Sequence, residues 1–196
     1  MLFFVLQGAI AMLLARSAMA PAGQALVVAS GVSGMLVYAL MRLVYWLSKT
    51  SGVPAMLSGS FARTLGWGMG AGLTAAAAAL GYLQLAHQYW PAAAAGVASN
   101  LERPLLLLLT LVAAPLCQEF IFRGLIFSGL RRSTGLLPSM LMSAALFAIV
   151  HPPASMLPAF LLGLLTAYVY DNTRALLAPV LVHAAFNVAL LVAPLA

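Results

Sequence analysis

Long apolar stretches separated by short polar breaks make up almost the whole chain. They predict seven membrane spans at about residues 1–15, 22–47, 65–86, 104–130, 136–151, 155–171 and 175–195. A helix needs about 20 apolar residues to cross a hydrocarbon core of roughly 30 Å, so the first span is short and the second is long. The pattern predicts an all-α, polytopic transmembrane helical bundle that forms a single integral membrane domain over residues 1–196.

Composition excludes an ordinary soluble domain. The 196 residues are 64% hydrophobic and 6% charged, whereas soluble domains carry about 25% charged residues. The net charge of +6 comes from basic residues scattered singly between apolar runs. This distribution is typical of loop anchors at a membrane surface and gives no reason to expect nucleic acid as a partner. The lipid bilayer is therefore the first expected partner.

The distribution of lysine and arginine predicts the orientation of the chain. Six basic residues fall in the loops on one side of the predicted bundle and two in the loops on the other side. The positive-inside rule then places the N-terminus in the cytoplasm. The apolar run of residues 2–15 partly resembles a signal peptide, but it lacks a basic start, so we interpret it as a retained helix. High Ala and Leu content, without eukaryotic targeting signals, favours a bacterial inner membrane.

Charged residues interrupt the fourth apolar run, where Gln118, Glu119 and Arg123 occur together. A charged group at hydrocarbon depth costs about 2.5–3.5 kcal/mol on insertion scales. Glu119 and Arg123 are four residues apart and so lie on one face of a helix, with the acid N-terminal to the base. We expect them to form an ion pair.

Further polar residues recur at a similar depth in other predicted spans. With a rise of about 1.5 Å per residue, Gln118 lies roughly 18 Å, His151 roughly 22 Å and His183 roughly 12 Å along their spans. Asn187 lies one turn beyond His183, so an imidazole and an amide on one face could both donate to a developing oxyanion. One such residue alone would be an interhelical hydrogen bond that holds the bundle. Several at one depth, beside an acid–base pair, predict a site.

The third span begins with four glycines in alternate positions, Gly66, Gly68, Gly70 and Gly72. These form two overlapping pairs spaced by four residues, the arrangement that lets a neighbouring helix approach closely. We predict a packing role for both pairs.

Three motifs occur in an order and spacing that resemble a known family. They are Gln118-Glu119-xxx-Arg123, Phe147-xxx-His151 and His183-xxx-Asn187. Over about residues 104–190, the chain resembles the CAAX-protease and bacteriocin-processing family of intramembrane proteases. That family has Glu-Glu-xxx-Arg, Phe-xxx-His and His-xxx-Asn in the same order. The first hundred residues carry no family signal beyond hydrophobicity.

The resemblance implies glutamate-dependent hydrolysis of a peptide bond within the membrane, without a cofactor. In the family, the first Glu of the pair and the histidine matched by His151 activate a water molecule. The residues matched by His183 and Asn187 stabilise the oxyanion, and those matched by Glu119 and Arg123 hold the site together. The implied substrate is a membrane-anchored protein or peptide, such as a lipidated tail or a C-terminal sorting segment.

The sequence departs from the family at Gln118, which stands where the family has its first Glu. An amide cannot accept a proton from water, so we expect the chain as written to be inactive or nearly so. We favour a deliberately inactivated protease, since Glu-to-Gln changes are used to trap substrate complexes, over a natural pseudoprotease. Glu119 as the base is less favoured because Arg123 would hold it as a counter-ion.

Two alternatives from other classes stay open. The first is a catalytically silent membrane protein that binds such a segment and confers immunity or acts as a chaperone. The second is a zinc protease with His151, His183 and a carboxylate as ligands, a plausible number for catalytic zinc. No His-Glu-xx-His motif supports this second alternative, and Asn187 suits an oxyanion better than a metal.

Overall fold

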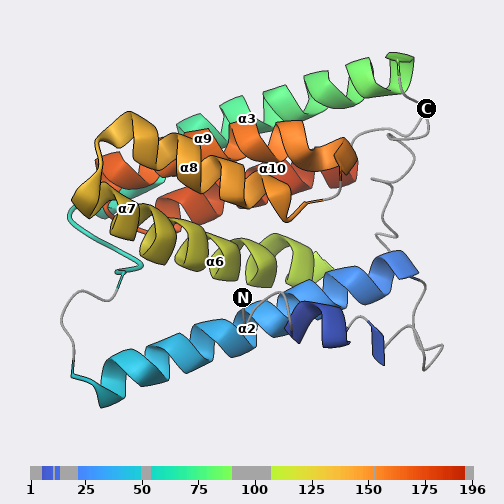
Figure 1. Cartoon of the computed structure of the whole chain (residues 1–196). Helices are drawn as coiled ribbons and strands as arrows, with labels where there is room; N and C mark the ends of the chain where they lie inside the picture. Colours follow the sequence, from blue (N-terminus) through green and yellow to red (C-terminus); the bar gives the residue numbers. More distant parts are fainter. Residues whose placement is uncertain are drawn as a thin grey trace. The chain divides into compact units, whose positions relative to one another are not determined.

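The computed structural model describes residues 6–10, 12–13, 22–49, 54–89, 107–151 and 153–192. The chain divides into two compact units (Figure 1). The first comprises Met1–Val53 and Ser99–Gln118, and the second comprises Pro54–Ala98 and Glu119–Ala196. The single membrane domain over residues 1–196 stays a prediction.

Every regular element in the described residues is helical, which confirms the predicted all-α fold. The α-helices are α2 (Ala22–Leu47), α3 (Phe61–Tyr89), α6 (Ala114–Glu119), α7 (Ser128–Ser133), α8 (Leu136–Ile149), α9 (Met156–Thr173) and α10 (Leu177–Val192). Two π-helical stretches, η1 (Leu109–Ala113) and η2 (Phe120–Phe127), flank α6, and a short 3-10 turn, η3 (Pro153–Ser155), precedes α9. These helices match six of the predicted spans, whereas most of the first span lies outside the described residues.

Two helices in the described residues are long and apolar enough to cross a membrane, Phe61–Ala86 and Leu109–Ser133. The helix α3 begins four residues before the predicted span because backbone carbonyls accept hydrogen bonds from two polar side chains of its first turn. Arg63 Nη2 donates to the Asn172 carbonyl at 2.9 Å, and Thr64 Oγ1 donates to the Ser60 carbonyl at 3.2 Å. The helix α8 ends at Ile149, before the Pro152-Pro153 pair in the sequence; Pro152 lies outside the described residues.

In the first unit, α2 packs against η1 through a glycine. A Cβ atom on Gly31 would lie 2.7 Å from Leu109 Cδ2, so only glycine fits without a shift of the leucine. The Cys117 thiol is buried and lies 3.6 Å from Met35 Sδ. This burial agrees with the structural role expected for an isolated thiol.

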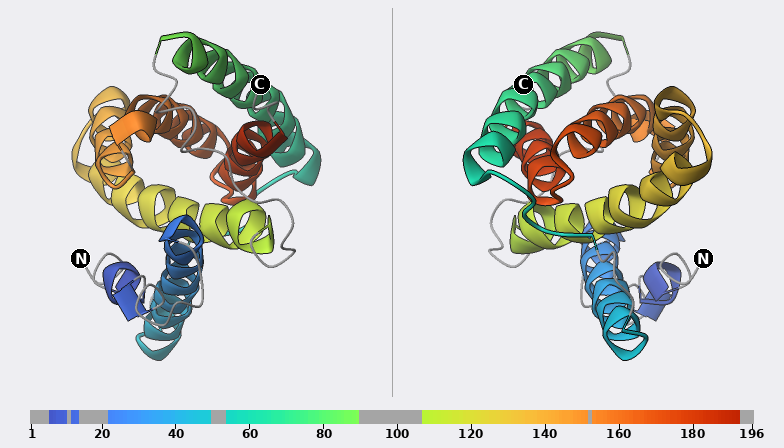
Figure 2. Two further views of the ribbon diagram at one scale, coloured as in Figure 1. Left: turned by 90° about the vertical axis from the view of Figure 1, so that its right-hand side faces the viewer. Right: turned by 90° about the vertical axis from the view of Figure 1, so that its left-hand side faces the viewer.

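In the second unit, α3 packs on α9 and α10, α9 packs on α8, and both α8 and α9 contact η2 (Figure 2). The core between them contains aromatic and small apolar side chains, among them Ala79, Phe122, Phe147, Val182 and Phe186. This packing brings together the end of α6, η2, the end of α8 and the middle of α10, the elements that carry the sequence motifs.

Only one of the two glycine pairs on α3 has the predicted packing role. A Cβ on Gly68 would lie 2.9 Å from Leu181 Cδ1, and one on Gly72 would lie 3.2 Å from Ala185 Cβ, both on α10. A Cβ on Gly66 or Gly70 would meet no atom within 4 Å among the described residues. For this second pair the packing prediction is wrong. The two pairs face different directions because alternate residues on a helix project to different sides.

Replacing Gly163 with valine is expected to destabilise the second unit by about 1–3 kcal/mol, the usual cost of overpacking. A Cβ on Gly163 would lie 3.0 Å from both Cα and Cβ of Ala144, so the backbones of α8 and α9 would have to separate. Thermal unfolding of the purified protein in detergent measures the effect. The matched control is Gly81→Val on α3, where the new Cβ meets no atom within 4 Å. Equal losses in both variants would contradict the prediction.

Candidate active site

The acid and the base of the first motif form a buried ion pair. Arg123 Nε lies 2.9 Å from Glu119 Oε2, and neither side chain is exposed. This confirms the ion pair predicted from their spacing. The Nε–H hydrogen bond itself points to Thr166, so the contact with Glu119 is electrostatic. Glu119 Oε2 and Arg123 Nη2 are buried without a hydrogen-bond partner in the described residues.

Hydroxyl groups from two other helices hold the guanidinium of Arg123. Arg123 Nε donates to Thr166 Oγ1 on α9 at 2.8 Å, and Nη1 donates to Ser143 Oγ on α8 at 3.3 Å. Ser143 in turn donates to the Phe122 carbonyl at 3.1 Å, and Thr166 donates to the Leu162 carbonyl at 2.9 Å. Each hydroxyl thus accepts from the arginine and donates to a backbone carbonyl. Arg123 therefore links η2 to both α8 and α9.

The first and third motifs meet through a hydrogen bond between residues 64 positions apart. His183 Nδ1 lies 2.8 Å from Glu119 Oε1, and both side chains are buried. A carboxylate only accepts hydrogen bonds, so Nδ1 carries a hydrogen and donates the hydrogen bond to Glu119. This contact fixes the ring of His183 on α10 and leaves its Nε2 for other partners.

The histidine of the second motif is held in a similar way. His151 follows α8, and its Nδ1 lies 2.7 Å from the Phe147 carbonyl, one turn earlier. A carbonyl can only accept, so Nδ1 of His151 is the donor and Nε2 of the neutral ring carries the lone pair. His151 is half-buried, in contrast to the buried His183.

The ring of Phe147 contacts three of the motif residues. Its centroid lies 4.6 Å from the ring centroid of His151 and 5.6 Å from that of His183, the latter in an edge-to-face arrangement. Arg123 Cζ lies 4.9 Å from the same centroid, within the range of a cation–π contact. Phe147 is fully buried, so these positions are set by core packing. Phe147, His151, His183, Arg123 and Glu119 therefore form one continuous cluster.

Comparison with known sequences finds a family that is similar to the part of the chain that carries this cluster. Residues 99–189 match the family described as Rce1-like, type II CAAX prenyl endopeptidase. All three motifs fall inside the matched segment. Residues 99–189, a little under half of the chain, are thus similar to the CAAX-protease family. The resemblance that the motifs carry is thereby confirmed.

A curated relative supports the same assignment. It is the Bacillus subtilis (strain 168) protein named "Putative membrane peptidase YdiL", which is 29% identical over 85 residues. These residues are 43% of this chain and 35% of that protein, so the match spans about a third of the length of the relative. No solved structure matches the chain significantly.

Within the matched segment, Asn187 lies on α10 one turn after His183 and is half-buried. Gln118 directly precedes Glu119 in the sequence, but it belongs to the first compact unit. Its convergence with the two histidines therefore stays a prediction. Among the described residues, no group of three His, Cys, Asp or Glu side chains is arranged to hold a metal ion.

Three residues of the cluster were not predicted as structural partners. Ser143 and Thr166 are common residues of apolar helices, and neither lies in a motif. The sequence feature that could have identified them is a hydroxyl group inside a predicted span, where a polar group needs a hydrogen-bond partner. Phe147 was noted as part of the second motif, but its contacts with Arg123 and His183 depend on how three helices pack.

Proposed function

We propose that the chain is a CAAX-type intramembrane endopeptidase whose present sequence is silenced by glutamine at position 118. Its substrate would be a membrane-anchored protein or peptide, either a prenylated tail or a C-terminal sorting segment. The observation that carries the proposal is the buried 2.8 Å contact between Glu119 and His183, which joins the first and third motifs in the matched segment. A buried carboxylate held by both an arginine and a histidine is the kind of arrangement that positions catalytic groups.

The proposed chemistry assigns each residue a role. A carboxylate at position 118 and Nε2 of His151 would take a proton from water while the water oxygen attacks the peptide carbonyl carbon. With its ring protonated at both nitrogens and paired with Glu119, His183 would donate from Nε2 to the resulting oxyanion, together with the amide of Asn187. The proton would then pass to the leaving nitrogen as the C–N bond breaks. The geometry supports these roles because both histidines use Nδ1 for positioning and keep Nε2 for the reaction.

Glu119 and Arg123 are positioning residues in this proposal. Glu119 Oε1 orients His183, and Arg123 balances the negative charge of the carboxylate inside an apolar core. Glu119 is therefore already engaged by two partners. This engagement favours position 118 over Glu119 as the place of the general base.

Histidine substitutions test the proposed site. In a chain that carries Gln118→Glu, His151→Ala and His183→Ala are each expected to lower cleavage of a prenylated CAAX peptide by about 10²–10⁴-fold, the usual contribution of an acid–base group. Mass spectrometry of the reconstituted protein and peptide identifies the products. The matched control is Gln88→Ala, an exposed polar residue near the end of α3 and outside the motifs. Full activity in either histidine variant would refute its assigned role.

Two further arms separate the alternatives. A chelator should leave cleavage unchanged if no metal takes part, whereas a loss that zinc restores would favour the zinc protease. The chain with Gln118 should bind the same peptide without cleaving it. If the Gln118→Glu form also binds without cleaving, the silent binding or immunity protein is the better description. The residue that the natural gene encodes at position 118 decides between an engineered and a natural silencing.

The location of the protein is part of the proposal. The family, the name of the relative and the two long apolar helices support an integral membrane protein. The Ala-rich and Leu-rich composition supports a bacterial inner membrane, and the positions of the basic residues support a cytoplasmic N-terminus.

A further inference from the structure

An open groove runs between α3 and α9 in the second unit, apart from the motif residues. Its volume is about 570 Å³, within the range typical of small-molecule sites. Its walls are Arg63, Gly66, Trp67, Gly70, Ala71, Thr74, Leu165 and Tyr168. The surface is apolar apart from the arginine at one end and two hydroxyl groups. This pattern is typical of a site for an amphipathic ligand.

The groove is open along α3 because two residues that line it are glycines, which have no side chain. Gly66 and Gly70 are one turn apart, and a Cβ on either would project into open space. The other glycine pair, Gly68 and Gly72, is used for close contact with α10. The two pairs therefore have separate functions on one helix. One pair joins two helices, and the other leaves a channel open beside α9.

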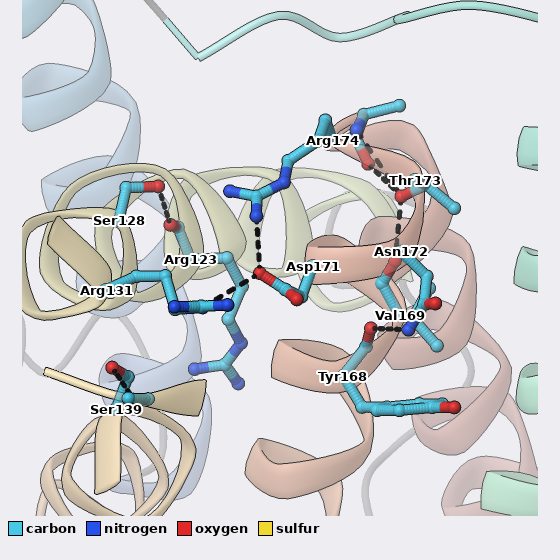
Figure 3. Close-up of polar contacts among 12 residues, drawn as sticks. Arg123, Ser128, Arg131, Ser139, Tyr168, Val169, Asp171, Asn172, Thr173 and Arg174 are labelled. Atoms are coloured by element: carbon cyan, nitrogen blue, oxygen red, sulfur yellow. Dashed lines mark hydrogen bonds and ion pairs between the residues drawn. The ribbon is translucent and has the colours of Figure 1, made fainter. Parts of the chain in front are cut away.

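Arg63 supplies a positive charge that no acidic residue in the described part of the chain balances. Its Nη2 donates to the Asn172 carbonyl at 2.9 Å, and no carboxylate in the described part of the chain forms an ion pair with it. The nearby Asp171 is already shared by Arg131, at 3.3 Å, and Arg174, at 2.6 Å, as Figure 3 shows. This end of the unit thus carries excess positive charge, which suits an anionic partner.

The length of the groove matches one leaflet of a bilayer. From Arg63 to Thr74 the helix rises by roughly 16 Å, about half of a hydrocarbon core of roughly 30 Å. Trp67, one turn from Arg63, forms an edge-to-face pair with Tyr168 at 5.8 Å. Such aromatic residues collect at the level of lipid headgroups. Beyond Thr74 and Leu165, a smaller cavity of about 130 Å³ continues between apolar side chains.

We propose that this groove binds an anionic glycerophospholipid. The lipid phosphate lies against the guanidinium of Arg63, and one acyl chain follows the channel over Gly66 and Gly70 toward Thr74. A guanidinium is well suited to phosphate oxygens, and the glycine floor lets the chain lie close to the helix backbone. The inference rests on the membrane location of the chain and is independent of the peptidase chemistry.

The test measures lipid bound to the purified full chain by native mass spectrometry and by the shift of its melting temperature. The probes are phosphatidylglycerol, a neutral diacylglycerol with the same acyl chains, and glycerol 3-phosphate. Arg63→Gln is expected to weaken phosphatidylglycerol binding by about 10- to 100-fold, the worth of a hydrogen bond to a charged group. Gly70→Leu is expected to weaken it by at least about tenfold, because the new side chain occupies the channel.

Matched controls make the result specific. Arg132→Gln removes an exposed arginine outside the groove, and Gly81→Leu adds a side chain into open space on α3 outside the groove. Both are expected to retain the lipid. If Arg63→Gln fails to fold, the comparison of Gly70→Leu with Gly81→Leu carries the test.

Three results would overturn the proposal. The first is equal retention of phosphatidylglycerol and diacylglycerol, which would mean that the phosphate is not recognised. The second is full competition by glycerol 3-phosphate, which would indicate a site for a free phosphate compound. The third is loss of bound peptide substrate, and not of lipid, in Gly70→Leu, which would assign the groove to the substrate. A chain with an unchanged groove that binds phosphatidylglycerol but shows no peptidase activity after Gln118→Glu would contradict only the proposed function.

Discussion

Replacing Gln118 with glutamate is expected to raise the rate of peptide cleavage by about 10²–10⁴-fold, the usual contribution of a general base. The two side chains have nearly the same shape, but only the carboxylate can take a proton from water. Binding of the substrate should change little, so the gain is expected in kcat and not in KM. Single-turnover assays with a prenylated CAAX peptide in proteoliposomes measure both quantities.

The paired control is Gln118→Asn, which keeps an amide and shortens the side chain. It should bind the peptide and cleave it no faster than the present chain. A second control is Gln118→Glu combined with His151→Ala, which restores the carboxylate but removes its proposed partner. If Gln118→Glu leaves cleavage at the level of the Asn variant, the carboxylate at position 118 is not the missing base.

Replacing Arg123 with alanine is expected to destabilise the second unit by about 3–5 kcal/mol, the cost of leaving a buried charge without its partner. Three groups lose a contact: the Glu119 carboxylate and the hydroxyls of Ser143 and Thr166. Since a domain is stable by only about 5–15 kcal/mol, the yield of folded protein should fall sharply. Size-exclusion chromatography after extraction and thermal unfolding measure the loss.

A double variant separates charge from packing. Glu119→Gln with Arg123→Met removes both charges, keeps an acceptor for His183 and fills the space of the arginine side chain. It should be more stable than Arg123→Ala, because replacing both members of a buried pair leaves no isolated charge. Arg132→Ala, at an exposed position, should have almost no effect. A double variant less stable than the single one would show that the ion pair itself stabilises the fold.

Much of the fold could be predicted because apolar runs of span length leave few choices. In a chain with so few charges, most polar breaks mark a helix end, and six predicted spans correspond to observed helices. The largest error is at α3, where Arg63 and Thr64 were interpreted as part of a loop. Backbone carbonyls accept from both side chains, so the helix continues through them. Hydropathy alone does not reveal that polar side chains have hydrogen-bond acceptors of this kind.

The candidate site could be predicted only as far as spacing within one helix determines it. The pair Glu119 and Arg123 follows from a separation of four residues, and the ion pair was found as expected. The contact between Glu119 and His183 joins two helices and depends on their relative rotation, which no local pattern specifies. The same reason explains why Phe147 was noted only as a motif position. Its contacts with Arg123 and His183 exist because α8 lies between these two partners, which are distant in the sequence.

The π-helical stretch η2 has a consequence for the phase of the helix that carries it. Arg123 and Arg131 are eight residues apart, and both reach α9, through Thr166 and Asp171. In an ideal α-helix, eight residues overshoot two full turns by about 80°, so the two side chains would point in different directions. Wider turns with hydrogen bonds from residue i to i+5 reduce the rotation per residue and bring the two arginines closer to alignment. The wider turns therefore accommodate one extra residue: seven residues of ideal α-helix turn by about 700°, so a chain one residue shorter there would need a regular α-helix to keep both arginines facing α9.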